Sequence, residues 1–174
     1  LSGERIAKEL RQIMIGGGLA DVVGLMRMAQ IDYAALGIKF NISPTSIDNT
    51  FDKTLGQLGW LAGLASVMPA GSSRALAKRL RLSRGEDRCL ARLDAGINDS
   101  ELALLNGPGW QQGAYYLGDL VPMLYAVQSW RNLVPTDAQR CAELIAWTPP
   151  KSPICGADLL SHGVDNGPGL GHML

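Results

Sequence analysis

Residues 60–92 read WLAGLASVMPAGSSRALAKRLRLSRGEDRCLAR. The run from Trp60 to Met68 is almost wholly apolar, and Pro69-Ala70-Gly71 closes it. Such a run, ended by proline and glycine, predicts an apolar helix. Further on, Ser83 and Glu86 have the spacing of a capping box, in which each side chain bonds the other residue's backbone N–H. One helix is therefore expected to end near Leu82 and the next to begin at Ser83.

Helical periodicity continues on both sides of this stretch, and strand signals are scarce. Near the N-terminus, apolar residues repeat at i, i+4 and i+7 (Ile6, Leu10 and Ile13) until a run of three glycines at 16–18. Further helices are expected at residues 19–26, 43–58, 110–130 (a pair interrupted by Pro122) and 135–147. The sequence therefore predicts an all-α fold.

Size and composition bound the class of protein. The 174 residues suffice for one domain with its own core, and 47% hydrophobic against 18% charged residues excludes a disordered chain. No apolar run approaches the roughly 18–20 residues of a membrane span. The three cysteines, Cys89, Cys141 and Cys155, are too far apart and odd in number for a disulfide framework. We expect buried thiols in a reducing cytoplasm.

The net charge is zero, but the bases are concentrated. Residues 73–92 hold seven bases and two acids, a local charge of +5 that the remainder of the chain offsets. Arg74, Lys78 and Arg81 are spaced at i, i+4 and i+7, and Arg84 extends the row. One helix face with this spacing can contact successive phosphates, and it can equally be an ordinary solvated face. Spacing alone does not separate the two.

Few other residues carry a chemical signal. Two histidines, His162 and His172, are too few and too separated for a metal site. The aromatic residues Trp110, Tyr115-Tyr116 and Trp130 lie in the apolar stretch 110–130, and we predict that they belong to the core rather than to a base-stacking surface.

The last nineteen residues read GADLLSHGVDNGPGLGHML (156–174), after the proline-rich stretch TPPKSP at 148–153. They predict a short helix, a left-handed glycine at Gly163, and a second helix that Pro168 starts. Free N–H groups after Gly167, around Gly169, could bind phosphate, whereas a hairpin that only packs on the body is the other interpretation.

This tail resembles the C-terminal G-A-D-L-L-x-x-G-V-x-x-G-P-x-x-G-x-x-L signature of bacterial CCA-adding tRNA nucleotidyltransferases and related poly(A) polymerases. Residues 2–10 (SGERIAKEL) are similar to that family's S-x-E-R-I-x-x-E-L neck helix. Residues 76–83 (LAKRLRLS) are similar to its L-x-x-R-L-[KR]-L-S body segment. The three stretches have the family's order, so the resemblance spans nearly the whole chain. It implies a neck helix remnant (1–18), an RNA-binding helical body (19–147), and a linker with a tail hairpin (148–174).

The resemblance also implies which of the family's catalytic motifs this sequence does not contain. The family transfers nucleotides from ATP and CTP, or from ATP alone, with two Mg²⁺ ions held by a D-x-D motif in an N-terminal head domain. This sequence contains no D-x-D. The family's base-selecting E-D-x-x-R is not matched either, because Leu90 stands where Glu86-Asp87 would need arginine. We expect a longer parent protein, with Mg²⁺ and ATP or CTP bound by the head, and a chain that is inactive by itself.

By the resemblance, Glu4, Arg5 and Glu9 would support the nucleotide pocket, although an exposed helix face is an equal interpretation. Arg74, Lys78, Arg81, Arg84, Gly167 and Gly169 would bind RNA. The expected partners are a tRNA or other RNA 3′ end and the linked catalytic head, with no membrane. Two alternatives stay open: a stand-alone helical nucleic-acid-binding module without catalysis, and a helical scaffold that binds proteins only. Neither CCA addition nor poly(A) addition is favoured.

Overall fold

A computed structural model describes residues 2–15, 19–41, 59–131, 138–150 and 156–163, and in these residues the regular structure is entirely helical, with no strand. The predicted all-α class is therefore confirmed. The predicted helix at 43–58 lies outside the described residues, as does Cys155. Among the described helices, none combines the length and the apolar character that crossing a bilayer requires.

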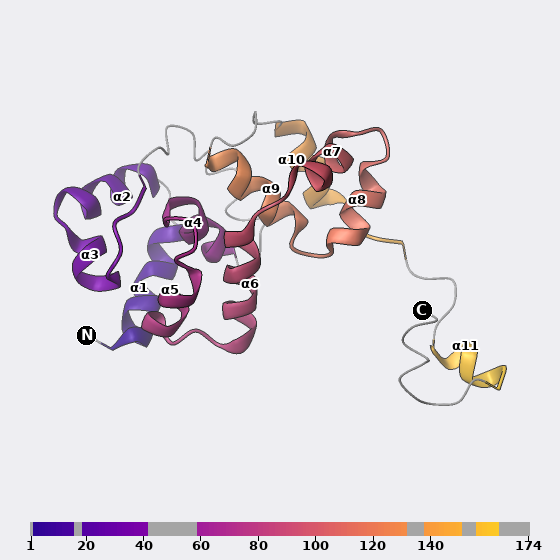
Figure 1. Cartoon of the computed structure of the whole chain (residues 1–174), viewed down its shortest axis with the longest axis horizontal. Coiled ribbons are helices and arrows are strands. Elements are labelled where there is room, and N and C mark those ends of the chain that lie inside the picture. The colour runs from indigo at the N-terminus through magenta and orange to yellow at the C-terminus, as the bar shows by residue number, and fades with distance from the viewer. Residues whose placement is uncertain (1, 16–18, 42–58, 132–137, 151–155, 164–174) are drawn as a thin grey trace.

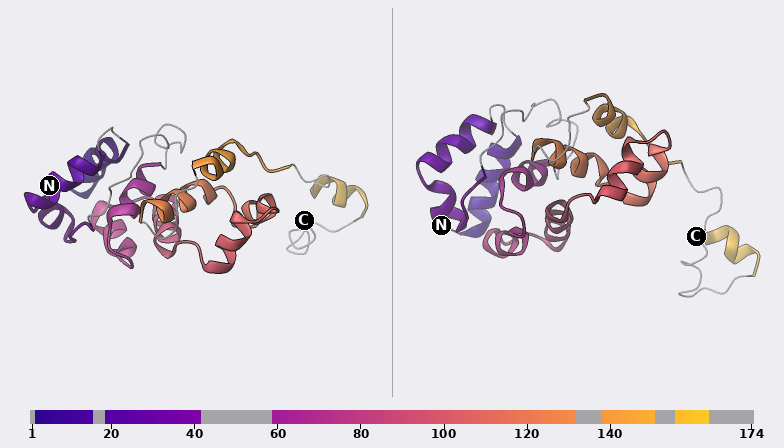
Figure 2. Two further views of the ribbon diagram at one scale, coloured as in Figure 1. Left: turned by 90° about the horizontal axis from the view of Figure 1, so that it is seen from above. Right: turned by 45° about the horizontal axis from the view of Figure 1, so that its top comes forward.

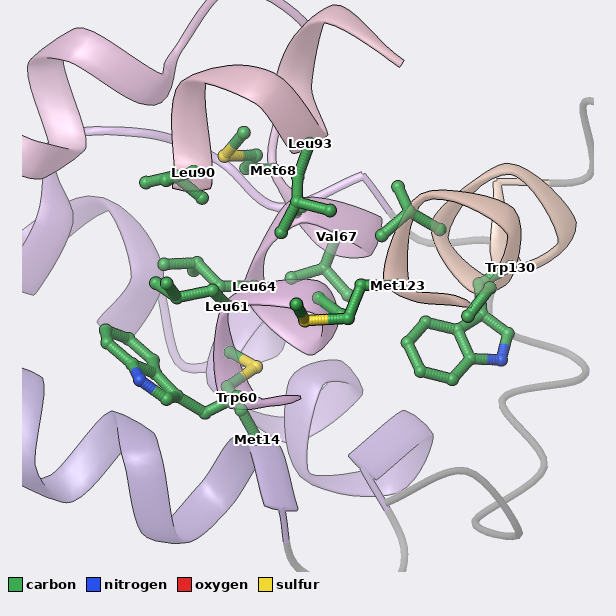
Figure 3. Close-up of a cluster of buried hydrophobic side chains, with 14 of the residues drawn as sticks. Met14, Trp60, Leu61, Leu64, Val67, Met68, Leu90, Leu93, Met123 and Trp130 are labelled. Carbon is green, nitrogen blue, oxygen red and sulfur yellow. The ribbon is translucent and has the colours of Figure 1, made fainter. Parts of the chain in front are cut away.

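The core is built around α4 (Gly59–Val67), the apolar helix at the start of residues 60–92. Only Ser66 of its residues is not fully buried. Three helices pack on it from different parts of the chain: α1 (Gly3–Ile15), α6 (Arg84–Ala95) and α9 (Val121–Trp130). Figure 3 shows the result, with α4 side chains meeting those of its neighbours. The labelled side chains in this cluster include Met14 of α1, Leu90 and Leu93 of α6, and Met123 and Trp130 of α9.

A helical hairpin that the sequence patterns only partly predicted follows α1. It consists of α2 (Leu19–Met28) and α3 (Ile31–Leu36), and the short α3 was not expected. The buried Asp32 carboxylate joins α3 to the return of the chain, accepting from the backbone N–H of Tyr33 and of Phe40 at 2.8 Å each. These bonds compensate a carboxylate that is only 1% exposed, and they bring Phe40 into the core.

The basic stretch forms two helices, α5 (Ser73–Leu80) and α6, which pack against each other. The predicted capping box is present: the Ser83 side chain accepts from the Glu86 N–H, and the Glu86 carboxylate accepts from the Ser83 N–H at 2.9 Å. The preceding helix ends at Leu80, because Arg81 adopts a left-handed conformation with φ 54°.

The second half of the body contains α7 (Asp99–Asn106), α8 (Trp110–Leu117), α9 and α10 (Ala138–Ala146). The chain breaks between α8 and α9 at Gly118, with φ 75°, and not at Pro122, which lies in the first turn of α9 where no N–H is required. The helix α7 was not predicted, although Asn98 and Glu101 form a capping box at its start.

The body is extended, as Figures 1 and 2 show: α1–α3 lie at one end, α7, α8 and α10 at the other, and α6 lies between them. Residues 148–150 are not helical, and α11 (Gly156–Ser161) follows the linker away from the body. The expected short tail helix and its left-handed glycine are present, since Gly163 has φ 85°. The predicted second tail helix, with Gly167 and Gly169, lies outside the described residues.

Substitution of Gly3 can test how closely α1 approaches α5. A Cβ at Gly3 would overlap the carbonyl oxygen of Arg79, whereas a Cβ at Gly24 in α2 would meet nothing within 4 Å. Gly3→Ala should therefore lower the free energy of unfolding by about 1–3 kcal/mol. Gly24→Ala should raise it by about 0.5–1 kcal/mol, because alanine restricts the unfolded chain and favours helix.

Urea denaturation of the two variants beside the wild type measures both effects. Equal changes in the two variants would show that the backbones of α1 and α5 do not approach in this way.

Candidate nucleic-acid interface

The bases of α5 divide between two sides of the helix. Leu76, Ala77 and Leu80 form its buried face. Arg74 and Lys78 lie one turn apart on one flank, exposed and without a salt bridge or hydrogen bond to the described part of the chain. Arg79 turns to the other flank, where its Nε donates to the Ala35 carbonyl oxygen at 2.9 Å.

Arg81 does not continue the row of Arg74 and Lys78, so the predicted three-residue face on one helix is wrong. The helix ends before it: the Leu82 N–H bonds the Ala77 carbonyl at 3.0 Å, which is the closing hydrogen bond of a Schellman motif. Such a motif requires the left-handed conformation at Arg81, where glycine is the usual residue. The Arg81 side chain instead reaches the N-terminal turn of α1, and its Nη1 lies 2.9 Å from Oε1 of Glu4.

Two further exposed bases, Arg84 and Arg88, lie on α6. They are one turn apart and exposed, on the side opposite the buried residues Cys89, Leu90 and Leu93. No bond to the described residues engages either of them. Arg92, by contrast, donates to the Gly96 carbonyl and pairs with Glu101 at 3.4 Å. Arg88 was not among the predicted site residues, although its spacing from Arg84 was visible in the sequence.

We define the basic surface as Arg74, Lys78, Arg84 and Arg88. A buried polar joint fixes the start of α5 that carries it. The Asp94 carboxylate accepts from the backbone N–H groups of Gly71 and Ser73, both at 3.1 Å. Its Oδ1 also lies 3.6 Å from Nη2 of Arg131. The Arg131 Nε donates to the Ala65 carbonyl at 3.0 Å. Asp94 thereby fastens α5 to α6, and through Arg131 to α4 and α9, a role that no sequence pattern indicated.

The three residues predicted to support a nucleotide pocket do not gather at one point. Glu4 faces α5, where the hydrogen bond from Arg81 lowers the pKa of its carboxyl below the usual range. Arg5 and Glu9 lie one turn apart on a different side of α1 and line an apolar cavity of about 450 Å³. The other residues of its wall come from the apolar sides of α1, α2 and α3 (Ile6, Leu10, Ile13, Met26, Ile31, Ala35 and Leu36).

Two of the three stretches that resemble the nucleotidyltransferase family lie side by side. Residues 2–10 form the first turns of α1, and residues 76–83 form the end of α5 and the turn after it. Gly3 packs against the backbone of Arg79 and Leu80, and the Glu4–Arg81 pair joins the same two segments. Two helical turns further on, Arg11 of α1 pairs with Glu86 of the capping box.

Glu86 and the two described cysteines have structural roles. Glu86 belongs to the capping box, as predicted, and Asp87 lies exposed in the same first turn. Cys89 and Cys141 are buried, as expected, and burial raises the pKa of the Cys89 thiol to about 11, which keeps it protonated and unreactive near neutral pH. Within the described ranges, no group of three or more His, Cys, Asp or Glu side chains is arranged to hold a metal ion.

Comparisons with known proteins give no counterpart: no protein-family model matches the chain, and neither a curated protein nor a solved structure does so.

The left-handed conformation of Arg81 can be tested by glycine substitution, with Lys78, which lies inside α5, as the comparison. Arg81→Gly should raise the free energy of unfolding by about 1 kcal/mol, because glycine adopts this φ without strain and the exposed pair with Glu4 contributes little. Lys78→Gly, inside α5, should lower it by about 1 kcal/mol. Thermal and urea denaturation of both variants provide the measurement. If both substitutions destabilise the protein equally, Arg81 does not occupy a glycine-type position.

The capping box predicts a pH dependence. Burial raises the pKa of Glu86, but the hydrogen bonds from Ser83 and the neighbouring Arg11 outweigh it, so the pKa lies below the usual value of 4.5. A carboxyl with a lowered pKa stabilises the fold above its unfolded pKa, and this contribution is lost as the pH falls through the folded pKa. Glu86→Gln should therefore cost about 0.5 kcal/mol at neutral pH and almost nothing well below pH 4.5.

Asp87→Asn, in the same helix turn, is the matched control for the general effect of a negative charge. Urea denaturation across the acid range provides the measurement: a Glu86→Gln effect that stays constant with pH would contradict the assignment.

Proposed function

We propose that this chain is the RNA-holding part of an enzyme that adds nucleotides to RNA 3′ ends, of the CCA-adding tRNA nucleotidyltransferase or poly(A) polymerase kind. The observation that carries the proposal is the set of three family-like stretches at residues 2–10, 76–83 and 156–174. They share the family's order along the chain and together reach from its first helix to its last residue.

The packing of the described residues supports it. Two similar stretches found by chance have no reason to meet in space, yet residues 2–10 and 76–83 contact each other through Gly3 and through the Glu4–Arg81 pair. Gly3 allows a backbone approach that a side chain would prevent. Through this contact, the helix that resembles the family's neck packs directly against the segment that resembles its body.

The charge distribution supports an RNA partner in particular. The four side chains of the basic surface extend into solvent from two consecutive helices, and no acid among the described residues neutralises them through an ion pair. A polyanion can displace the counterions of such a surface and gain affinity that depends on salt.

In this proposal the chain binds the RNA and positions its 3′ end. The linked head domain supplies Mg²⁺ and binds ATP or CTP. Arg74, Lys78, Arg84 and Arg88 hold phosphates of the RNA. The joint at Asp94 and the close packing of Gly3 against Arg79 and Leu80 keep α5 in a fixed place relative to α6 and α1. Holding the RNA end still is catalytically useful, because a positioned 3′-hydroxyl reacts without the entropy cost of a second encounter.

Neutralising the basic surface tests the proposal. Changing Arg74, Lys78 and Arg84 to glutamine should weaken binding of a tRNA lacking its 3′ end. It should also reduce the slope of log K against log salt by about 0.9 for each phosphate that the variant no longer binds. Fluorescence anisotropy over a series of salt concentrations measures both quantities.

The control changes Lys8 and Lys39, which are bases on α1 and after α3 and lie outside the basic surface, to glutamine. This pair should leave the slope nearly unchanged. Absence of salt-sensitive tRNA binding by the wild type would favour the protein-binding scaffold. An unchanged slope in the triple variant would place the RNA elsewhere on the chain.

A further inference from the structure

Two of the aromatic residues that were predicted to belong to the core are exposed in the structure. They lie at the end of the body away from α1. Trp130 is buried as expected, but Tyr115 and Tyr116 of α8 are 55% and 74% exposed. The physical reason is that α8 packs on α7 through the small residues Gly113 and Ala114, which leaves the following tyrosines outside the contact.

Tyr115 borders a cavity of about 340 Å³, and Tyr116 does not. The cavity lies between α8, α9 and the end of α10, which are joined in space and not in sequence. Its volume is at the small end of the roughly 300–1,000 Å³ that small-molecule pockets occupy. Ten residues line it: Ala114, Tyr115, Gly118, Asp119, Val121, Pro122, Leu144, Ile145, Trp147 and Pro149.

Aromatic and proline side chains contribute part of the wall of this cavity. Tyr115 and Trp147 contribute rings, and Pro122 and Pro149 contribute the faces of their pyrrolidines. Trp147 is held in place by Trp110, at 5.9 Å between ring centroids in an edge-to-face arrangement. Flat aromatic walls of this kind stack on the faces of unpaired bases, whatever the base.

Asp119 gives the cavity a chemical preference. It is an exposed residue in the turn between α8 and α9, and it belongs to the cavity lining. An ionised carboxylate only accepts hydrogen bonds. It therefore favours a base with an exocyclic amino group, such as cytosine with its N4 donors, over uracil, which presents a carbonyl oxygen at that position and can donate only through its ring N3–H.

We propose that this cavity binds one unpaired, amino-bearing base of the RNA, stacked on Tyr115 and hydrogen-bonded to Asp119. The inference rests on the proposed function, because it takes RNA to be the partner. In Figure 1, α6, the helix that carries Arg84 and Arg88, lies between α1 and the helices α8 and α10 that contribute to the cavity.

Short oligocytidylate and oligouridylate of equal length test the preference. The full chain should bind oligocytidylate about fivefold or more tightly than oligouridylate at the same salt concentration, because cytosine offers the carboxylate an amino group where uracil presents a carbonyl oxygen. Asp119→Asn should remove the preference, since an amide can both donate and accept. Anisotropy titrations with the two oligonucleotides provide the numbers.

Tyr115 and Tyr116 offer a matched pair of variants. Tyr115→Ala should weaken oligocytidylate binding about fivefold or more, the usual effect of removing a stacking ring. Tyr116→Ala should leave it unchanged, although this ring is adjacent and more exposed. Both side chains are outside the core, and circular dichroism confirms that both variants are folded.

Equal binding by the two tyrosine variants, or equal affinity of the wild type for the two oligonucleotides, would overturn the cavity proposal. The proposed function fails in a different way, through salt-slope results that do not respond to Arg74, Lys78 and Arg84. A chain that binds tRNA through the basic surface while Tyr115→Ala has no effect would retain the function and rule out the cavity.

Discussion

The burial of α4 is the constraint on which the rest of the structure depends. A helix that is apolar on every side gains stability only when neighbours cover all of it, and α1, α6 and α9 do so here. Each of these helices carries or adjoins a candidate functional feature. The helix α1 presents Glu4, Arg5 and Glu9, α6 presents Arg84 and Arg88, and the turn before α9 contains Asp119. Packing around α4 therefore fixes where the candidate surfaces lie relative to one another.

Buried polar groups define the joints between the helices. Asp94 accepts two backbone N–H groups at the start of α5 and faces Arg131, and Asp32 accepts two more where the chain returns after α3. A buried carboxylate without such donors would cost several kcal/mol, so each one specifies a single arrangement of its segment. Arg11 adds a further joint, because it lies 5.1 Å above the Trp60 ring and pairs with Glu86. The first helix is thus attached to both α4 and the capping box.

The two proposed RNA contacts differ in kind and complement each other. The basic surface on α5 and α6 attracts phosphates of any sequence, and the cavity at α8–α10 distinguishes bases by their hydrogen-bonding groups. Phosphate contacts supply most of the affinity and set the orientation of the RNA, whereas a base contact supplies a sequence preference. An extended helical body separates these tasks along its length: α8 and α10, which contribute to the cavity lining, lie at the end opposite α1–α3 (Figure 2).

The sequence by itself determined the helices whose signals are local. The apolar run at 60–68, the capping box of Ser83 and Glu86, and the left-handed Gly163 were all predictable, because each depends on residues within one or two turns. Tertiary structure decided which side of each helix is covered. The Arg81 side chain lies toward Glu4 and away from Arg74 and Lys78, because a Schellman motif ends α5 at Leu80, one residue before Arg81. Tertiary structure also left Tyr115 and Tyr116 exposed, because α8 packs through smaller residues, and it assembled a cavity from segments as distant as Ala114 and Pro149. Burial depends on the partner across the interface, and a partner remote in sequence leaves no periodic signal in the helix that it covers.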